Sequence, residues 1–436
     1  MSLQQVCQQY FQSTDIPSLN RVVLDARLVS PGDIFVAIKG QCHNGHDFIQ
    51  LAIEKGACLV IGTESRPFPQ HIYKRVCDQQ KTLYELACIY RQYLSQIVAI
   101  TGSVGKTTTK DMLKCCLAAK YTVAATDGNQ NNELGVPLTI LNCPTHMDYL
   151  IVEMGAKRQG DIAYLMDCVR PNISILTTVA DAHMASFGSL ECIAKTKSEI
   201  LAPSGHTSEM ACYDADLADL YQWHTSRIAM PLGMHLSGDG SYQFTPLGAT
   251  QYTLSLVVGQ DTYSWTVSIC GQHLLHNLVK AIRVAMACGV GQRDIEHALN
   301  SLPQSQGRMF MRDIGDLTVC DDTYNASPQS VSAGIDEISK MPGKKAFVFG
   351  QMAECGEHEV MLHCKLLEKA KNFDLIVGIG EVFEHDACSV HCHEINVPVE
   401  ELKNILNQHN ISIVYIKGSR YMKMERYIKS LEVSVV

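Results

Sequence analysis

The stretch IVAITGSVGKTTTKDMLKCCL, residues 97–117, decides how the rest of the chain is interpreted. Its apolar beginning predicts a buried strand, and its amphipathic end predicts a helix. Between them, Gly102 and Gly105 let the backbone fold closely around a phosphate, so that N–H groups and the helix N-terminus face the anion. Lys106 adds a positive charge, and Thr107 supplies the hydroxyl that such loops place on Mg²⁺. The stretch therefore predicts a nucleoside triphosphate site.

The loop departs from the common G-x-x-x-x-G-K-[ST] pattern. Ile100 stands where that pattern has its first glycine, so the string reads T-G-x-x-G-K-T-T. A glycine-containing turn before an ordinary basic helix is the alternative interpretation. Strand, loop, Lys-Thr pair and amphipathic helix nevertheless follow one another in the order that a phosphate loop requires. Nucleotide binding is therefore the working hypothesis.

Length and charge limit the class of protein. The 436 residues are enough for about three domains. Acidic residues number 45 against 36 basic ones, a net charge of −9, and no Lys/Arg block forms, so nucleic acid is not expected as a partner. No apolar run reaches the roughly 18 residues of a membrane span, and the N-terminus has neither a basic start nor an apolar core like those of signal peptides. We expect a cytoplasmic protein.

Cysteine usage points to reduced thiols. The 18 cysteines are scattered through predicted helices and strands of a long chain, which is untypical of a disulfide framework. Cys388, His391, Cys392 and His393 have a spacing that resembles a set of metal ligands. No second matching pair occurs elsewhere, so a polar loop or helix end is favoured over a zinc site.

Residues 1–96 read as a small α/β module. Strands are predicted at 22–24, 34–38 and 57–62, with a turn at residues 31–33 and a helix at 48–55. His43 and His46 lie in the polar loop before that helix. We interpret both as loop residues rather than metal ligands.

Polar residues follow the next apolar strands of the middle section. The loop TDGNQNNELG is rich in amides, and the strand DYLIVEMG ends with Glu153. Open α/β sheets place metal ligands at such carboxyl ends, beside a bound nucleotide, although an exposed strand end fits the pattern too. His183 follows the strand ISILTTV, and Lys197 lies on a helix that begins near Ser189. From the pattern alone, these two are a structural histidine and a solvated lysine.

The later sequence predicts a change of architecture and then a return to α/β. Residues 251–258 and 262–269 alternate polar and apolar side chains across a GQD turn, which predicts an antiparallel hairpin. Helices are predicted at 278–288 and 293–299, and SLPQSQGR indicates a domain boundary. Residues 309–436 predict a parallel sheet covered on both faces. The predicted fold is α/β in three domains, residues 1–96, 97–307 and 308–436.

Several motifs together resemble the Mur ligases of bacterial cell-wall synthesis. The resemblance spans nearly the whole chain and rests on PGDIFVAIKG with NGHDF, TGSVGKTTTKDM, GNQNNELGVPLTIL, VEMGA, AHMASFGSLECIAKTKSEI, GQH, QGR, DDTYNASP, MAECGE and KGSR. It implies a UDP-substrate domain, a central P-loop ATP-binding domain with an antiparallel extension, and a C-terminal Rossmann-like ligase domain. It also implies amide formation. ATP phosphorylates the terminal carboxylate of UDP-N-acetylmuramoyl-tripeptide to an acyl phosphate, and the amine of D-alanyl-D-alanine then displaces that phosphate.

The resemblance assigns roles by motif. It places the ATP phosphates against Gly102, Ser103, Gly105, Lys106, Thr107 and Thr108, and the rest of ATP against Asn277, Arg308 and Asp322. It implies Mg²⁺ ligands at Thr107 and Glu153, a second Mg²⁺ at His183, and a lysine at Lys197 that is carbamylated in several members. It brings Asn132 near the acyl phosphate. Lys106, His183, Lys197 and Asn132 are thereby the expected catalytic residues, in a chain expected to be monomeric.

The chain departs from the family's motifs at several positions, and other functions share the ATP chemistry. Ala26 replaces the serine of a D-S-R motif, Leu274 replaces an asparagine after GxH, and Gln351 and Cys355 alter G-D-M-x-E-L-G. A sister ligase or folylpolyglutamate synthase adding one amino acid is the nearest rival. A P-loop switch without ligase activity is the rival of another class, although the base-reading N-K-x-D motif is missing from the sequence. The sequence contains no readable motif that tells whether the tripeptide carries lysine or diaminopimelate.

Overall fold

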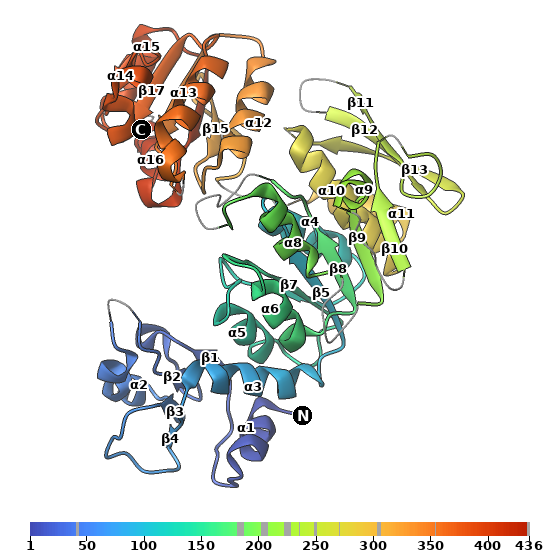
Figure 1. The fold of residues 1–436 in the computed structure, drawn as a ribbon, viewed down its shortest axis with the longest axis vertical. Helices are drawn as coiled ribbons and strands as arrows, with labels where there is room; N and C mark the ends of the chain where they lie inside the picture. Colours follow the sequence, from blue (N-terminus) through green and yellow to red (C-terminus); the bar gives the residue numbers. More distant parts are fainter. Residues whose placement is uncertain are drawn as a thin grey trace.

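A computed structural model describes residues 1–40, 43–180, 187–201, 208–221, 228–234, 236–247, 251–269, 271–302, 307–353 and 355–433. Its elements form four sheets, and the chain runs from one end of an elongated molecule to the other (Figure 1). Among these residues, no helix has the length and apolarity needed to cross a membrane. The predicted three-domain α/β fold is confirmed.

The N-terminal sheet is small and fully parallel. Its strands lie in the order β1-β2-β3-β4, with bounds Val22–Val23, Ile34–Val36, Leu59–Gly62 and Tyr73–Arg75. The predicted strands are present but shorter, and β4 was not predicted. The accompanying helices are α1 (Leu3–Phe11), η1 (Ala26–Leu28), η2 (Gly45–Phe48), α2 (Ile49–Glu54) and α3 (Gln79–Arg91). Helix α3 continues toward the central sheet (Figure 1).

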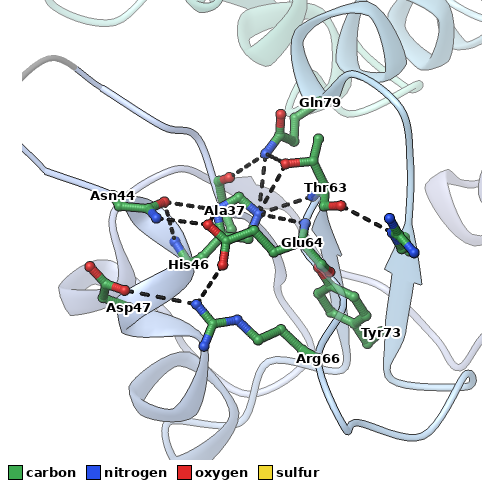
Figure 2. Close-up of polar contacts among 10 residues, drawn as sticks. Ala37, Asn44, His46, Asp47, Thr63, Glu64, Arg66, Tyr73 and Gln79 are labelled. Atoms are coloured by element: carbon green, nitrogen blue, oxygen red, sulfur yellow. Dashed lines mark hydrogen bonds and ion pairs between the residues drawn. The ribbon is translucent and has the colours of Figure 1, made fainter.

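A buried histidine fastens the loop after β2. His46 is 3% exposed, and its Nδ1 lies 2.8 Å from Asn44 Oδ1 while its Nε2 accepts a hydrogen bond from Thr63 N at 2.9 Å (Figure 2). The accepting Nε2 leaves Nδ1 as the donor, so the ring is neutral, and burial lowers its pKa. Both ring nitrogens are therefore used within the protein, and His46 lies in the short helix η2 rather than in the predicted loop.

The central sheet consists of parallel strands in the order β10-β9-β8-β5-β7-β6. Their bounds are Ile228–Leu232, Met210–Asp214, Ile173–Leu176, Gln96–Thr101, Tyr149–Glu153 and Val123–Ala125. The helices between them are α4 (Lys106–Ala118), α5 (Gly135–Leu141), α6 (Asp161–Val169), α8 (Leu190–Ser198) and α9 (Ala215–Tyr221). Because all strands run the same way, their carboxyl ends share one edge.

An antiparallel sheet extends this region, as predicted. Strands β12 (Gln251–Val258) and β13 (Asp261–Ser268) form the predicted hairpin, and β11 (Tyr242–Pro246) pairs with β12. Helices α10 (Gln272–Ala287) and α11 (Gln292–Asn300) follow. Helix α10 begins before its predicted start at residue 278, because polar residues of its first turn hide the apolar period there.

The C-terminal sheet is mixed, which corrects the prediction of a purely parallel one. Its order is β14-β15-β19-β16-β17-β18, and β14 pairs antiparallel with β15. The strand bounds in that order are Phe310–Ile314, Leu317–Asp322, Ile413–Lys417, Lys345–Gly350, Leu375–Ile379 and Glu394–Ile395. The residues of β14 are all at least partly exposed, which suits an edge strand, and they lack the continuous apolar pattern of buried parallel strands.

Helices cover both faces of this sheet. They are α12 (Pro328–Ser339), η3 (Gly356–His358), α13 (Glu359–Lys369), η4 (Glu381–Glu384), α14 (Asp386–Ser389), α15 (Leu402–Gln408), η5 (Arg420–Met422) and α16 (Glu425–Val433). Alternate residues of β19 enter different cores, Ile413 and Tyr415 on one face and Val414 and Ile416 on the other. Period-two burial on two apolar faces explains why this strand is uniformly hydrophobic.

The central strand β5 divides its side chains in the same way. Ile97 and Ala99 pack into a core shared with the N-terminal module, while Val98 and Ile100 pack against α4, α10 and the antiparallel sheet. Both cores therefore hold the strand that leads into the glycine loop. This two-sided packing fixes the position of the loop at the carboxyl edge of the sheet.

Candidate functional site

Two glycines shape the loop between β5 and α4. Gly102 has φ +150°, and a Cβ there would lie 2.0 Å from Thr177 Oγ1; Gly105 has φ +81°, and a Cβ there would lie 2.6 Å from Asn277 Oδ1. Both positions therefore exclude side chains for steric as well as conformational reasons. Gly105 is the N-cap of α4 and has no side chain that could cap it. The first-turn N–H groups of α4 are consequently available to an anion, as predicted.

Neighbouring strand ends hold the loop in place. Ser103 N donates to Thr178 O at 2.8 Å, and Ser103 Oγ accepts from Ala180 N at 3.0 Å. Thr177 Oγ1 donates to Val104 O at 2.6 Å. The Ser103 hydroxyl is thus bonded to the backbone beyond β8, which anchors the loop, and the residue lines the cavity described below. Its expected contact with phosphate stays a prediction.

Lys106 folds back over the loop. Its Nζ donates to Gly102 O at 2.8 Å and to Ser103 O at 3.0 Å. Burial lowers the pKa of Lys106, the Glu153 carboxylate raises it, and the Arg308 charge lowers it further. The ammonium is therefore held by two carbonyl oxygens, which a phosphate could replace with a stronger charge-assisted interaction.

Oxygen ligands meet at the ends of β7 and the start of α4. Thr107 Oγ1 donates to Glu153 Oε2 at 2.7 Å, and Asn131 Nδ2 donates to Glu153 Oε1 at 2.8 Å. Glu153 is 2% exposed. The backbone of Asn131 is held in turn, because Gly155 N donates to Asn131 O at 2.7 Å. The carboxylate and hydroxyl are thus adjacent, as predicted, and Asn131 orients the carboxylate. Asn131 was not predicted as a site residue, although it belongs to the amide-rich loop noted in the sequence.

Asn132 has a different local function from its neighbour. Its Oδ1 accepts hydrogen bonds from Gly135 N at 2.9 Å and Leu134 N at 3.3 Å, at the start of α5. This pattern is that of a helix-capping side chain. The residue still lines the cavity described below. Its expected role near an acyl phosphate stays a prediction.

Lys197 is buried rather than solvated. It is 2% exposed on α8, with Nζ 3.4 Å from Ala156 O and 5.5 Å from the centre of the Phe187 ring. Burial and, next, the charge of Lys106 lower the pKa of Lys197 to about 7. The interpretation of Lys197 as a solvated helix lysine, made from the sequence pattern alone, is therefore wrong. At pH 7 a substantial fraction of this buried amine is therefore neutral, and a neutral amine is a nucleophile.

The opposite side of the site comes from α10 and the C-terminal region. Asn277 is 7% exposed beside Gly105. The Arg308 guanidinium lies 4.2 Å from the centre of the Tyr324 ring, and Tyr324 N donates to Gly307 O at 3.0 Å. The Tyr324 ring therefore holds Arg308 facing the cavity through a cation–π contact.

Asp322, at the end of β15, is the centre of a buried polar cluster. Its Oδ2 accepts from Lys417 Nζ at 2.6 Å and from Tyr415 OH at 3.1 Å, and its Oδ1 accepts from Met309 N at 3.3 Å. Lys417 is 2% exposed. The KGSR motif contains Lys417, but the sequence alone gave no reason to pair it with Asp322, because β15 and β19 become neighbours only in the folded sheet.

One cavity collects these residues. Its lining includes the described candidates Ser103, Gly105, Lys106, Thr107, Thr108, Asn132, Glu153, Lys197, Asn277, Arg308 and Asp322. Gly102 lies beneath the loop and is not part of that lining. His183 lies outside the described residues. Segments far apart in the sequence thus provide a single site between the central and C-terminal sheets.

The chemistry of the lining fits a nucleotide and a magnesium ion. The open N-terminus of α4 and the Lys106 ammonium suit phosphate, and the adjacent Thr107 hydroxyl and Glu153 carboxylate are the hard oxygen ligands that Mg²⁺ prefers. The sequence Cys388, His391, Cys392 and His393 gives no comparable set: His393 Nδ1 accepts from Ile376 N at 3.0 Å, and no group of three or more metal-ligating side chains occurs in the described parts of the chain.

Family models match most of the chain. The Mur ligase family catalytic domain matches residues 18–88, the Mur ligase middle domain residues 100–285, and the Mur ligase glutamate ligase domain residues 307–412. The three matches fall in the N-terminal, central and C-terminal parts of the chain. The chain belongs to the Mur ligase family.

Relatives and solved structures similar to this chain include MurF enzymes. The chain is 30% identical to UDP-N-acetylmuramoyl-tripeptide–D-alanyl-D-alanine ligase of Escherichia coli K12, over 97% of this chain and 95% of the relative. It matches a crystal structure of MurF from Acinetobacter baumannii with a TM-score of 0.86, 28% identity and 99% coverage of both chains. A MurF structure from Thermotoga maritima in complex with ADP matches with a TM-score of 0.82 and 29% identity, over 95% of this chain and 98% of that one.

Proposed function

We propose that this chain is an ATP-dependent, ADP-forming ligase that joins D-alanyl-D-alanine to UDP-N-acetylmuramoyl-tripeptide through an acyl phosphate, a step of peptidoglycan synthesis. The observation that carries the proposal is the cavity that joins the phosphate loop, Glu153 and Lys197 to Arg308 and Asp322. Similarity to MurF proteins along the whole chain supports the choice of substrates. Nothing in the described site selects lysine or diaminopimelate at the third peptide position.

The phosphate loop and Lys106 address the first physical difficulty of this reaction. A carboxylate must approach the anionic terminal phosphate of ATP, and the two repel each other. Lys106 moves from the carbonyl oxygens of Gly102 and Ser103 to the phosphates, where its charge offsets that repulsion. The N–H groups at the start of α4 add positive potential at the same place. These groups stabilise charge that is transferred with the phosphoryl group.

Thr107 and Glu153 would hold a magnesium ion beside the phosphates. When bound, Mg²⁺ neutralises phosphate charge and orients the oxygens of the transferred group. Asn131 keeps the Glu153 carboxylate turned toward Thr107 through its 2.8 Å hydrogen bond. His183 is proposed as a ligand of a second Mg²⁺, on the motif alone.

Lys197 is proposed as a carbamylated residue. The neutral form of its amine can attack CO₂, which forms an N–C bond, releases a proton and converts the side chain into an anionic oxygen ligand. The same burial that makes the ammonium unfavourable makes the amine available. The carbamate would place its oxygens at the magnesium side of the cavity, near Lys106.

The remaining assignments complete the proposal. Asn277, Arg308 and Asp322 hold the nucleotide from the α10 and C-terminal side, and Asn132 faces the acyl phosphate. We propose domain bounds of 1–96 for the UDP end of the substrate, 97–307 for ATP and 308–436 for the domain that closes over the site. Closure would exclude water from the acyl phosphate. We propose a monomer, as the family resemblance implies, and the substrates support a cytoplasmic location.

The function is tested by product mass. The purified chain is incubated with ATP, Mg²⁺, D-alanyl-D-alanine and either the lysine or the diaminopimelate UDP-tripeptide. We expect ADP release and a product that is heavier by D-alanyl-D-alanine less one water. Omitting D-alanyl-D-alanine should remove the product while binding of ATP persists.

Rival functions give different results in the same assay. A sister ligase or a folylpolyglutamate synthase would release ADP with a single amino acid and not with the dipeptide. A nucleotide switch would bind or hydrolyse ATP at a rate that no UDP-peptide changes. Either result would overturn the proposal.

A further inference from the structure

Two thiols approach each other closely in the C-terminal region. Cys364 on α13 and Cys388 on α14 have their Sγ atoms 2.8 Å apart. Non-bonded heavy atoms usually rest at separations of about 3.5–4.0 Å. Both cysteines are reduced. The backbone therefore already brings these sulfurs within the approach that precedes a bond between them.

The two thiols differ in their access to solvent. Cys388 is fully buried, and its Sγ also lies 3.6 Å from Val360 O, whereas Cys364 is partly exposed. Burial, reinforced by the neighbouring Cys364, raises the pKa of Cys388 to about 12, and burial raises the pKa of Cys392 to about 11. Small oxidants thus reach Cys364 first, and its neighbours are protected thiols.

We propose that Cys364 and Cys388 form a reversible modification site, at which a hydroperoxide oxidises Cys364 and Cys388 then closes a disulfide. In the first step, with hydrogen peroxide, the Cys364 thiolate attacks one peroxide oxygen and the O–O bond breaks, which gives a sulfenic acid and hydroxide; the hydroxide takes up the proton that the Cys364 thiol released and leaves as water. In the second step the Cys388 sulfur attacks the Cys364 sulfur, the S–O bond breaks, and a second water leaves with the thiol proton. The two thiols lose two electrons, which reduce one peroxide.

The position of the pair predicts what the modification does. Helix α13 contributes Met361, Leu362 and Lys365 to the cavity lining, while Cys364 packs against the C-terminal core. Because the sulfurs already approach each other, bond formation requires little movement of α13. We therefore expect turnover to change less than about twofold. The cross-link closes a loop between residues 24 apart and should raise the unfolding midpoint of this region by roughly 4 °C or more.

The experiment uses the full chain, in which a second pair of neighbouring thiols is broken by one substitution. Cys88 and Cys168 are also hydrogen-bonded to each other, so Cys88→Ser is included in every variant. The reduced protein is titrated with hydrogen peroxide, free thiols are alkylated, and peptides are mapped by mass spectrometry. We expect the Cys364–Cys388 link at a peroxide concentration at least fivefold below that which oxidises the exposed Cys77, and its loss after dithiothreitol.

Serine variants separate the roles of the two sulfurs. In Cys388→Ser, Cys364 should lose its resolving partner and proceed to the sulfinic acid, and in Cys364→Ser, Cys388 should stay reduced. Cys392→Ser is the matched control and should leave the link unchanged. Oxidation of Cys77 before the pair, a link between Cys364 and Cys392, or an unlinked pair at excess peroxide would overturn the proposal. The unmutated pair is assayed directly, so the proposal stays testable if a variant misfolds.

Discussion

The two sides of the cavity hold their charged groups in different ways. On the central side, Lys106 bonds to two carbonyl oxygens, Thr107 bonds to Glu153, and Lys197 has one long contact of 3.4 Å. On the C-terminal side, Asp322 is tied to Lys417 at 2.6 Å and to Tyr415 at 3.1 Å. The central groups have partners that a ligand can replace, whereas the C-terminal acid has partners built into the fold.

This difference separates the chemical step from the holding of the nucleotide. Groups that exchange protein partners for phosphate, metal or CO₂ change their interactions during the reaction, so their removal should lower kcat. Groups fixed by a buried ion pair interact equally before and during the reaction, so their removal should act on KM or on stability. Four substitutions, ordered by their effect on turnover, test this division.

Lys197→Ala should have the largest effect. The substitution removes the amine that CO₂ would convert into an oxygen ligand, and we expect turnover to fall by at least about 10³-fold. Short carboxylic acids should restore part of the activity by occupying the vacated space. Turnover is measured by ADP release. Unchanged activity in Lys197→Ala, or the absence of rescue, would contradict the carbamate.

The pH dependence of Lys197 gives an independent measurement. Its folded pKa of about 7 lies below the ordinary 10.5, so the unfolded chain binds more protons between these values. The contribution of Lys197 to stability therefore rises with pH across this interval and is smallest below about pH 7. Carbamate formation needs the neutral amine and should rise in the same direction. Carbon-13 NMR with labelled CO₂ measures it, with Lys197→Arg as the control.

Lys106→Met should lower turnover by about 10²–10³-fold, the usual cost of removing one preorganised charge from a phosphoryl-transfer site. The methionine retains most of the aliphatic length but cannot exchange two carbonyl oxygens for phosphate. Nucleotide affinity is measured by calorimetry beside kcat. Lys110→Met is a useful comparison, because that buried lysine bonds to Thr126 O and lies off the cavity lining. An equal loss in both variants would indicate misfolding rather than catalysis.

Sequence patterns predicted most of the fold because buried parallel strands are short apolar runs with clear ends. The apolar runs at residues 317–322 and 345–350 are the strands β15 and β16, and the hairpin of β12 and β13 was found from alternation alone. The edge strand β14 was missed because its half-exposed residues have no continuous apolar pattern. Strand order depends on which segments pair across long separations, and a single sequence carries no local signal for that.

The candidate site was predictable where residue type and strand position coincide. Glu153 follows an apolar strand, and the glycines and Lys106 form a local motif. Lys197 could not be assigned from composition, because its function depends on burial by segments distant in sequence. Asn131 and Lys417 were missed for a related reason: each is identified by the carboxylate it meets, Glu153 or Asp322, and that meeting exists only in the folded chain.

Asn131→Ala should have a smaller, metal-specific effect. Without the 2.8 Å hydrogen bond, Glu153 loses the donor that orients it toward Thr107. We expect apparent Mg²⁺ affinity to weaken about 10–100-fold, as for other residues that orient metal ligands. Saturating Mg²⁺ should recover most of kcat. Mg²⁺ is titrated at fixed ATP, and Asn132→Ala, which removes a cap rather than this bond, should leave the Mg²⁺ midpoint nearly unchanged.

Lys417→Met should change kcat least, by about twofold or less, and instead destabilise the protein. It leaves the Asp322 carboxylate buried with Tyr415 and a backbone N–H as its remaining partners, which typically costs about 3–5 kcal/mol of unfolding free energy. Urea unfolding followed for the C-terminal region measures this loss. The double variant Lys417→Met/Asp322→Asn removes the unpaired charge and should recover part of the stability, while its KM for ATP rises because the carboxylate is gone. A large fall in kcat for Lys417→Met with unchanged stability would contradict this division. Lys417 would then belong with the groups that exchange protein partners for phosphate, metal or CO₂, and the central and C-terminal sides of the cavity would not differ.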